Sequence, residues 1–377
     1  MFIKIFYKIK YYYRNIELIY WRKISDKLYN QKSTYSISTN FYNKNGEKGN
    51  NKSNKWLNHN LVIYLSSRNN YDLMRGEFVK KVDTQGFKII NVDDGSTKDE
   101  RIKGEKLCVE NNIIFLNNSG KGIQWATQTA INYLSGLGSK CEWLIHFTHD
   151  NFPISANFFK MISKLIISKD INNYGCIGFN HMELTKTLDS FKEWNKGINA
   201  CGLLGLGRLT KMPDRNPYLG GSKTISWDWN TWGSPFLVES VLTPSFGINI
   251  NLFKKYIEVT DDFRLFFWSD DVCFQFLLNG INNLVIPELV TINRQDVKEK
   301  YSVPVKSART IGTSTGNYYF SSHVDHHENW KRKWGWHLND RNSFLPVRKR
   351  YKDTLLDKFF FHDIMSGPFK SYSDIQL

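Results

Sequence analysis

The chain has 377 residues, enough for one large domain or two ordinary ones with a substantial hydrophobic core. No pair of its five cysteines has C-x-x-C spacing, which excludes a disulfide framework and a zinc knuckle and indicates a reducing compartment. No segment reaches the roughly 18 to 20 apolar residues that cross a bilayer, and lysines interrupt the N-terminal segment too often for a signal peptide. We therefore expect a cytoplasmic location.

The net charge of +15 is concentrated near both ends of the chain. Residues 1–60 hold 12 Lys and Arg against 3 Asp and Glu, and residues 331–358 hold 9 against 3, so the two segments carry +9 and +6. Basic segments attract nucleic acid, anionic lipid or an anionic substrate. The sequence contains no nucleic-acid-binding motif, so we expect no nucleic-acid partner.

The N-terminal region predicts two segments before the main domain. Residues 1–31 mix Phe, Ile, Tyr and Trp with Lys and Arg and contain no Pro or Gly, which predicts a basic amphipathic helix. Such a helix either lies on an anionic membrane, on its cytoplasmic face, or packs on the main domain of its own chain. Residues 32–57 are rich in Asn, Ser, Lys and Gly and predict a low-complexity linker.

From residue 58 onward, predicted strands alternate with predicted helices. Apolar runs at 61–65, 89–92, 112–116 and 142–147 predict strands, and segments at 71–83, 98–110 and 123–135 predict helices. Such alternation is typical of a mostly parallel sheet with crossover connections. We therefore predict an α/β fold over residues 58–300, with a Rossmann-like, mostly parallel central sheet flanked by helices. A basic extension would follow at residues 301–377.

Two adjacent carboxylates, Asp93 and Asp94, follow the second predicted strand and precede a Gly-Ser pair. In an open α/β sheet, ligands bind beyond the carboxyl ends of the strands, so acids at this edge suit a polar or metal-bound ligand. Asp-Gly is also an ordinary turn signal, and the pattern alone leaves both interpretations open. The other predicted strands also end in polar residues, at 66–69, 117–122 and 148–151.

The order of these motifs resembles that of the inverting GT-A glycosyltransferases of family 2. The resemblance covers about residues 60–335 and implies a nucleotide-sugar half at 58–155 and an acceptor half at 156–300. It is carried by Ser66 to Asn69, Asp93 to Ser96, Asn118 to Gly120, Thr148-His149-Asp150, Thr243 to Asn249, Phe266 to Asp271, and Lys333-Trp334-Gly335.

The resemblance implies a nucleotide-sugar as donor, with a UDP-sugar expected. A carboxylate at a strand end can accept a hydrogen bond from the N–H of the nucleobase, and Asp93 is the candidate for this role. Asp94 would either bind the ribose or support Asp93. Ser66 and Arg68 would frame the nucleotide. Lys121, just before the third predicted helix, contacts either a phosphate or solvent.

The resemblance also implies a divalent metal, Mn²⁺ or Mg²⁺, that neutralises the diphosphate leaving group. The family's Asp-x-Asp motif is here Thr148-His149-Asp150, so Asp150 is the expected metal ligand and His149 would favour manganese. His323 is a further candidate ligand. Alternatively, the cluster of His323, His326 and His327 is a polar segment that contacts the diphosphate or solvent.

An inverting transfer needs a general base that takes the proton of the acceptor hydroxyl. Asp271 is the first candidate and Asp270 the second. The alternative is that Ser269 or Asp270 caps the N-terminus of the following helix. Glu239 and the pair Asp261-Asp262 are lesser candidates, which we interpret as surface charges.

We therefore predict an inverting glycosyltransferase that acts on a glycan or lipid-linked acceptor in bacterial surface polysaccharide biosynthesis, such as capsule or lipopolysaccharide. Tryptophans at 227–232 form either an acceptor platform or part of a core. Three alternatives differ from this prediction. The altered Asp-x-Asp motif favours an inactive binding module, and residues 150–154 faintly resemble metal-independent branching N-acetylglucosaminyltransferases. A nucleotidyltransferase normally has a glycine-rich basic loop after the first strand, which 66–70 is not.

Overall fold

The computed structural model describes residues 55–149, 151–153, 157–184, 196–198, 200–201, 236–241, 245–264, 267–294, 318–338 and 341–356. Only the backbone is described for residues 180–184, 196–198, 200–201, 236–237, 287–288, 293–294, 318–325 and 341–342. The predicted helix of residues 1–31, the tryptophans at 227–232 and Asp150 lie outside the described residues. Most of the predicted linker does too, although its last residues begin a short 3-10 helix, η1 (Lys55–Asn58).

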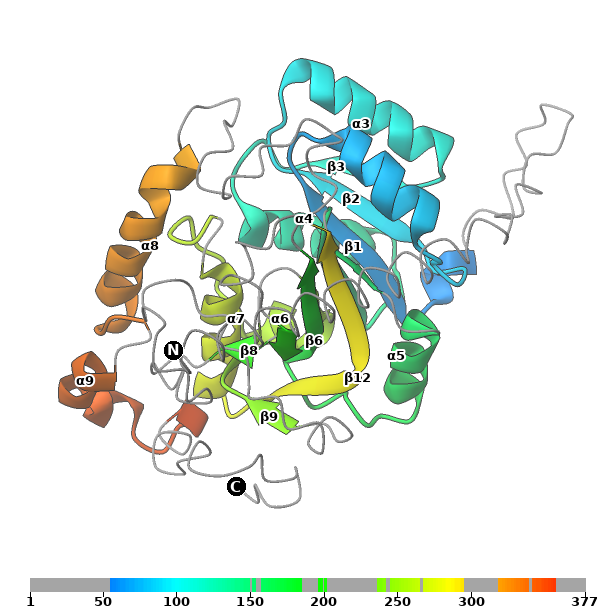
Figure 1. Cartoon of the computed structure of the whole chain (residues 1–377). Coiled ribbons are helices and arrows are strands. Elements are labelled where there is room, and N and C mark those ends of the chain that lie inside the picture. The colour runs from blue at the N-terminus through cyan, green and yellow to red at the C-terminus, as the bar shows by residue number, and fades with distance from the viewer. Residues whose placement is uncertain are drawn as a thin grey trace, which may run out of the picture.

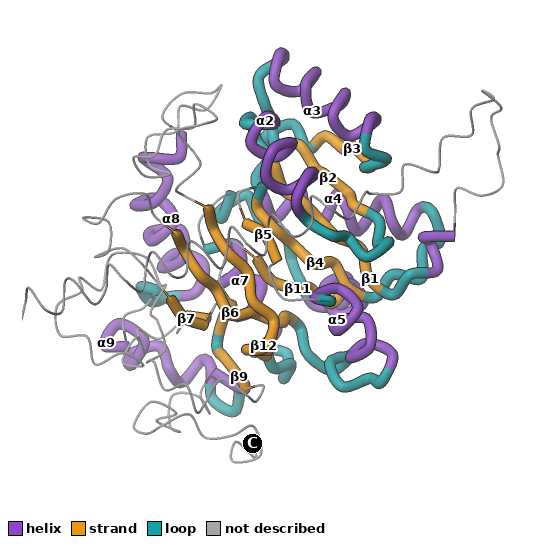
Figure 2. Tube along the Cα trace, turned by 45° about the vertical axis from the view of Figure 1, so that its right-hand side comes forward, coloured by secondary structure: helices purple, strands orange, loops and turns teal. Residues whose placement is uncertain are grey.

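The described strands are β1 (Leu61–Ser67), β2 (Ile89–Asp93), β3 (Ile114–Asn117), β4 (Trp143–Thr148), β5 (Asn151–Pro153), β6 (Cys176–Leu184), β7 (Lys196–Ile198), β8 (Ala200–Cys201), β9 (Phe236–Val238), β10 (Ser240–Val241), β11 (Ser245–Asn249) and β12 (Asn283–Arg294). The central sheet runs in the order β3-β2-β1-β4-β11-β6-β12-β5, with β7 beside β6 and β9 beside β12 (Figures 1 and 2). Strands β8 and β10 pair separately.

The described helices are α2 (Tyr71–Leu73), the π-helical η2 (Met74–Val79), α3 (Lys98–Glu110), α4 (Ile123–Gly136), α5 (Phe158–Ile167), α6 (Ile250–Tyr256), α7 (Trp268–Leu278), α8 (Tyr318–Trp334), α9 (Arg341–Phe344) and the 3-10 helix η7 (Leu345–Tyr351). None of them is both long enough and apolar enough to span a bilayer.

The first four strands confirm the predicted α/β fold class. β1 pairs in parallel with both β2 and β4, and β2 pairs in parallel with β3. Helices fill each crossover: α2 and η2 follow β1, α3 follows β2, and α4 follows β3. All seven residues of β1 are buried, as expected for a strand covered by helices on both faces.

Alternating side chains of β4 show which helices cover each face of the sheet. His146 makes an edge contact with Trp268 of α7, with ring centres 5.3 Å apart. The next residue, Phe147, contacts Phe78 of η2 and Phe158 of α5 at 5.9 and 6.0 Å. Successive strand residues point to opposite faces, so α7 covers one face, and η2 and α5 cover the other. Figure 2 shows this arrangement of three layers.

The second half of the chain adds antiparallel pairings to the sheet. β11 lies antiparallel between β4 and β6, whereas β6 and β12 run parallel to each other. Gly247 of β11 permits this close packing, because a Cβ there would lie 2.5 Å from the side chain of Ile177. Because β11 is antiparallel to both of its neighbours, β6 and β12 run in the same direction as β4, and β11 is the reversed strand between them.

The described part of the predicted C-terminal extension packs directly on α7. Phe274 of α7 contacts the rings of Trp334, Trp336 and Tyr351 at 4.8, 5.0 and 5.5 Å. Trp330 and Trp336 are fully buried. Aromatic burial of this extent makes α8 and η7 part of the same hydrophobic core as the sheet.

Candidate functional site

The carboxyl ends of β1, β2 and β4 meet at one edge of the sheet. In the parallel register Ser67 pairs with Asp93, and Ser66 pairs with Thr148. Asp94 continues this edge, because its N–H donates to the carbonyl of Ser67 at 2.8 Å. The structure thus brings together the predicted donor-site residues Ser66, Arg68, Asp93 and Asp94, and His149 directly follows β4.

Asp93 holds the turn that follows β2. Its Oδ2 accepts hydrogen bonds from the hydroxyls of Tyr71, at 2.5 Å, and Ser96. Its Oδ1 accepts hydrogen bonds from the N–H groups of Gly95 and Ser96 at 3.1 and 3.0 Å. Burial and the charge of Asp93 raise the pKa of Tyr71, so its hydroxyl stays protonated and donates. Both carboxylate oxygens of Asp93 therefore accept hydrogen bonds from Tyr71 and from the turn that follows β2.

Asp94 fixes the loop between β3 and α4. Its Oδ1 accepts hydrogen bonds from the side-chain amide of Asn118 and the N–H of Gly122 at 2.8 and 2.9 Å. Burial raises the pKa of Asp94 above its ordinary value, whereas these two donors and the charge of Arg68 act in the opposite direction. Its Oδ2 accepts no hydrogen bond from any residue that the structure describes. Asp94 thus retains an acceptor atom that Asp93 lacks.

The β3–α4 loop is clamped to the segment that precedes α7. Gly122 has a φ of +102°, and a Cβ there would lie 2.5 Å from the Cα of Arg264, so only glycine fits. The N–H of Ile123 donates to the carbonyl of Arg264 at 2.7 Å. The side-chain oxygen of Gln124 accepts a hydrogen bond from the N–H of Thr260 at 2.8 Å. The loop that Asp94 holds is therefore continuous with the acceptor half.

His146 is a site residue that the sequence did not reveal. Its Nε2 lies 2.8 Å from the hydroxyl of Ser66, and its ring packs on Trp268 at the start of α7. It is fully buried. Its only signal in the sequence is a polar residue within the apolar run of 142–147. His146 therefore links the carboxyl end of β1, where Ser66 lies, to α7, which carries the candidate bases Asp270 and Asp271.

The N-terminus of α7 differs from the predicted cap. The capping residue is Phe267, which makes no side-chain capping hydrogen bond, so the interpretation of Ser269 or Asp270 as the N-cap is wrong. The helix begins earlier because the carbonyl of Phe267 already accepts the N–H of Asp271 at 2.8 Å. Phe267 has a φ of +61°, a strained conformation for a bulky residue of the kind that clusters at functional sites. Asp270 and Asp271 lie in the first turn, where the helix dipole favours carboxylates.

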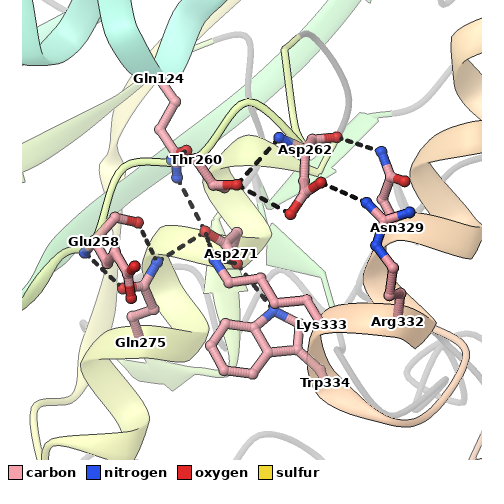
Figure 3. A network of polar contacts seen from close by, with 10 residues as sticks. All are labelled: Gln124, Glu258, Thr260, Asp262, Asp271, Gln275, Asn329, Arg332, Lys333 and Trp334. Carbon is pink, nitrogen blue, oxygen red and sulfur yellow. Dashed lines mark hydrogen bonds and ion pairs between the residues drawn. The ribbon is translucent and has the colours of Figure 1, made fainter.

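Asp271 is the centre of a buried polar network (Figure 3). The ammonium group of Lys333 donates to both of its oxygens, at 2.9 and 3.1 Å. The indole N–H of Trp334 donates to Oδ1 at 2.9 Å, and the amides of Gln124 and Gln275 donate to Oδ2 at 3.0 and 2.8 Å. Burial raises the pKa of Asp271, whereas Lys333 and the two amides lower it. The carboxylate thus joins α4, α7 and α8.

Asp270 occupies a different environment from its neighbour. It is 7% exposed, whereas Asp271 is 0% exposed. Among its contacts, the Oγ of Ser240 donates to Oδ1 at 2.8 Å. Ser240 belongs to β10, so Asp270 faces β10 and Asp271 faces α8.

The lesser candidates and Lys121 have structural contacts. Lys121 is exposed, and its Nζ lies 5.5 Å from the ring centre of Trp125. The indole N–H of Trp125 donates to Asp261 at 2.8 Å, and Asp262 forms an ion pair with Arg332 of α8 at 2.6 Å. These positions agree with the interpretation of the Asp261-Asp262 pair as surface charges. For Glu239 that interpretation is wrong, because the residue is 6% exposed and lies between β9 and β10.

The predicted metal ligands lie mostly outside the described side chains. Asp150 falls in a gap, and only the backbone of His323 is described. The described residues contain no group of three His, Cys, Asp or Glu side chains that could hold a metal ion, so the metal site stays a prediction. His326 and His327 pack on Phe267, with ring centres 6.4 and 4.6 Å away.

The sequence matches no protein-family model. It also matches no curated protein sequence. Its structure is similar to GalNAc-T7 crystallised with UDP, GalNAc and Mn²⁺, at a TM-score of 0.41 and 11% identity over 78% of this chain and 58% of that one. It is also similar to TarS 1–349 of S. aureus, at a TM-score of 0.37 and 13% identity over 73% of each chain. For S. aureus TarS, the TM-score is 0.37 and the identity 11%, over 76% of this chain and 45% of that chain. The chain thus spans 58% of the length of the GalNAc-T7 chain that it matches.

Proposed function

We propose that this chain is an inverting glycosyltransferase of the GT-A type that moves a sugar from a nucleotide-sugar to a glycan or lipid-linked acceptor. The observation that carries the proposal is the physical connection between two acids far apart in the sequence. Asp94 at the strand edge holds the loop that contains Gly122. Two residues later, Gln124 donates to Asp271, beside Asp270. A nucleotide bound at the strand edge would therefore lie near the carboxylates of α7, as donor and acceptor chemistry require.

We assign nucleotide recognition to Asp94 rather than Asp93. A carboxylate that accepts the N–H of a nucleobase needs a free acceptor atom. Both oxygens of Asp93 accept hydrogen bonds from its own turn, whereas Oδ2 of Asp94 accepts none within the described part of the chain. Arg68 follows β1 at the same edge, and its positive charge acts on Asp94 and suits a diphosphate. Asp93 is then the residue that shapes the site, and a UDP-sugar is the donor we expect.

We assign the general base to Asp270. A base must reach the acceptor hydroxyl, and the fully buried Asp271 accepts hydrogen bonds from four side chains. In the transfer, the acceptor oxygen would bond to the anomeric carbon while its proton passes to Asp270. The bond from that carbon to the diphosphate oxygen would break, and the nucleoside diphosphate would leave with the electron pair. A divalent metal, when bound, would stabilise the charge on that leaving group.

Matched substitutions of the two acids test this assignment. We expect Asp270→Asn to lower transfer or donor hydrolysis by about 10²- to 10⁴-fold, while nucleotide affinity stays unchanged and the unfolding temperature falls less than in Asp271→Asn. Asp271→Asn should instead lower the unfolding temperature, because it weakens the ion pair with Lys333. Asp261→Asn, at an exposed acid, is the control. Full turnover in Asp270→Asn would refute the base assignment.

A nucleotide screen tests the donor and the alternatives. Thermal shifts with UDP, GDP and CMP, each with and without Mn²⁺, would identify the nucleotide, because a ligand that binds the folded state raises its unfolding temperature. Nucleotide binding without transfer or hydrolysis would support the inactive binding module. Turnover that persists in EDTA would support the metal-independent branching type.

A further inference from the structure

We propose that the exposed side of η7 is a docking surface for an anionic lipid bilayer. The surface consists of Leu345, Pro346, Lys349, Arg350 and Lys352, all of them exposed. It is distinct from the candidate site. It is also distinct from residues 1–31, whose predicted helix either lies on an anionic membrane or packs on the main domain.

The surface is rigidly mounted on the core. Phe344, which precedes η7, and Tyr351, its last residue, are 0% and 7% exposed. Their rings stack with centres 5.7 Å apart, and both rings contact Trp336 at 5.1 Å. The hydroxyl of Tyr351 donates to the carbonyl of Trp334 at 2.5 Å. This anchoring fixes the direction in which the remaining side chains of η7 point.

The helical period places a proline ring and a cation on the same outer edge of η7. In a 3-10 helix, residues three apart lie along one edge, so Pro346 and Lys349 align, and Lys352 follows directly after the helix. Arg350 lies beside Gly335 at the end of α8. No ion pair joins Lys349, Arg350 or Lys352 to an acid within the described ranges. The nearest acid in the sequence is Asp353, so the surface is net positive.

The exposed apolar residues favour a bilayer over a soluble polyanion. Leu345, the first residue of η7, is 51% exposed. A surface that binds a bilayer combines apolar groups, which enter the headgroup region, with cations, which attract anionic lipid. Because either kind of group alone binds a membrane only weakly, their combination favours a bilayer as the partner. A soluble polyanion would bind the cations but would make no apolar contact with Leu345.

Vesicle co-sedimentation of the full chain tests the proposal. We expect binding to phosphatidylcholine vesicles that contain phosphatidylglycerol, little binding without it, and a decrease in binding at high salt. The variant K349E/K352E should bind at least about tenfold more weakly. L345S should also weaken binding. The control K160E/K164E makes the same charge change at two exposed lysines of α5 and should bind like the unmodified chain.

The outcomes separate the bilayer from other partners and from the glycosyltransferase proposal. Unchanged vesicle binding in K349E/K352E, or an equal loss in K160E/K164E, would overturn the proposal. Stronger binding to soluble polyphosphate than to vesicles at equal phosphate concentration would overturn it in favour of an anionic polymer. Donor hydrolysis does not require a membrane, so these results leave the proposed activity to its own test.

Discussion

Replacing Lys333 by methionine should strongly destabilise the fold. The ammonium group lies 2.9 Å from Asp271, and the two side chains are 17% and 0% exposed. Removing one member of a buried ion pair costs about 3 to 5 kcal/mol, because the other charge stays buried. Asp271 keeps hydrogen bonds from Gln124, Gln275 and Trp334, so we expect the lower end, about 3 kcal/mol. Lys331→Met, at an exposed position of the same helix, should change stability by less than about 0.5 kcal/mol.

Urea unfolding at two pH values checks both the size and the origin of this loss. Burial raises the pKa of Asp271 above its unfolded value, so its contribution to stability is largest at low pH and falls as the pH rises through the folded pKa. Without Lys333 that pKa rises further, so the variant should lose more stability near neutral pH than at about pH 5. A loss below about 1 kcal/mol near neutral pH, or one that grows as the pH falls, would refute the reasoning.

Three further substitutions test other contacts. Gly122→Ala should lower stability by at least about 2 kcal/mol and weaken nucleotide binding, because the added Cβ would meet the backbone of Arg264; urea unfolding and UDP titration measure the two effects. Tyr71→Phe should cost about 1.5 to 3 kcal/mol, since it removes a hydrogen bond to the buried Asp93, and a normal unfolding midpoint would contradict that role. Trp330→Ala should cost about 3 to 5 kcal/mol by leaving a cavity between α7 and α8, measurable by calorimetry.

The first half of the fold could be predicted because its signals are local. Each parallel strand is a short apolar run bounded by polar residues, and the helix predicted at 98–110 matches α3. Parallel register then brings the polar strand ends to one edge, where Ser66, Arg68, Asp93 and Asp94 lie, while the family resemblance singled out Ser66 and Arg68. The direction of β11 was not predicted, because strand pairing between distant segments leaves no local pattern.

The roles within pairs of adjacent acids could not be predicted from the sequence. Asp93 and Asp94 are chemically identical, and only the hydrogen-bond partners show which one keeps an acceptor atom. The same holds for Asp270 and Asp271, because the partners of Asp271 include Gln124, 147 residues before it, and Lys333, 62 residues after it. The Lys-Trp-Gly element was recognised as part of the family resemblance, but its contact with the second acid was not foreseen.

The ion pair between Asp271 and Lys333 also sets an order of events during synthesis. A ribosome that adds about 5 to 20 residues per second reaches Lys333 about 3 to 12 s after Asp271, given the 62 residues between them. Until then, the carboxylate of Asp271 on α7 cannot form its buried ion pair with Lys333. We therefore expect α7 to complete its packing only after α8 has been synthesised, and a chain truncated before Lys333 to be less stable and more readily degraded than the full chain.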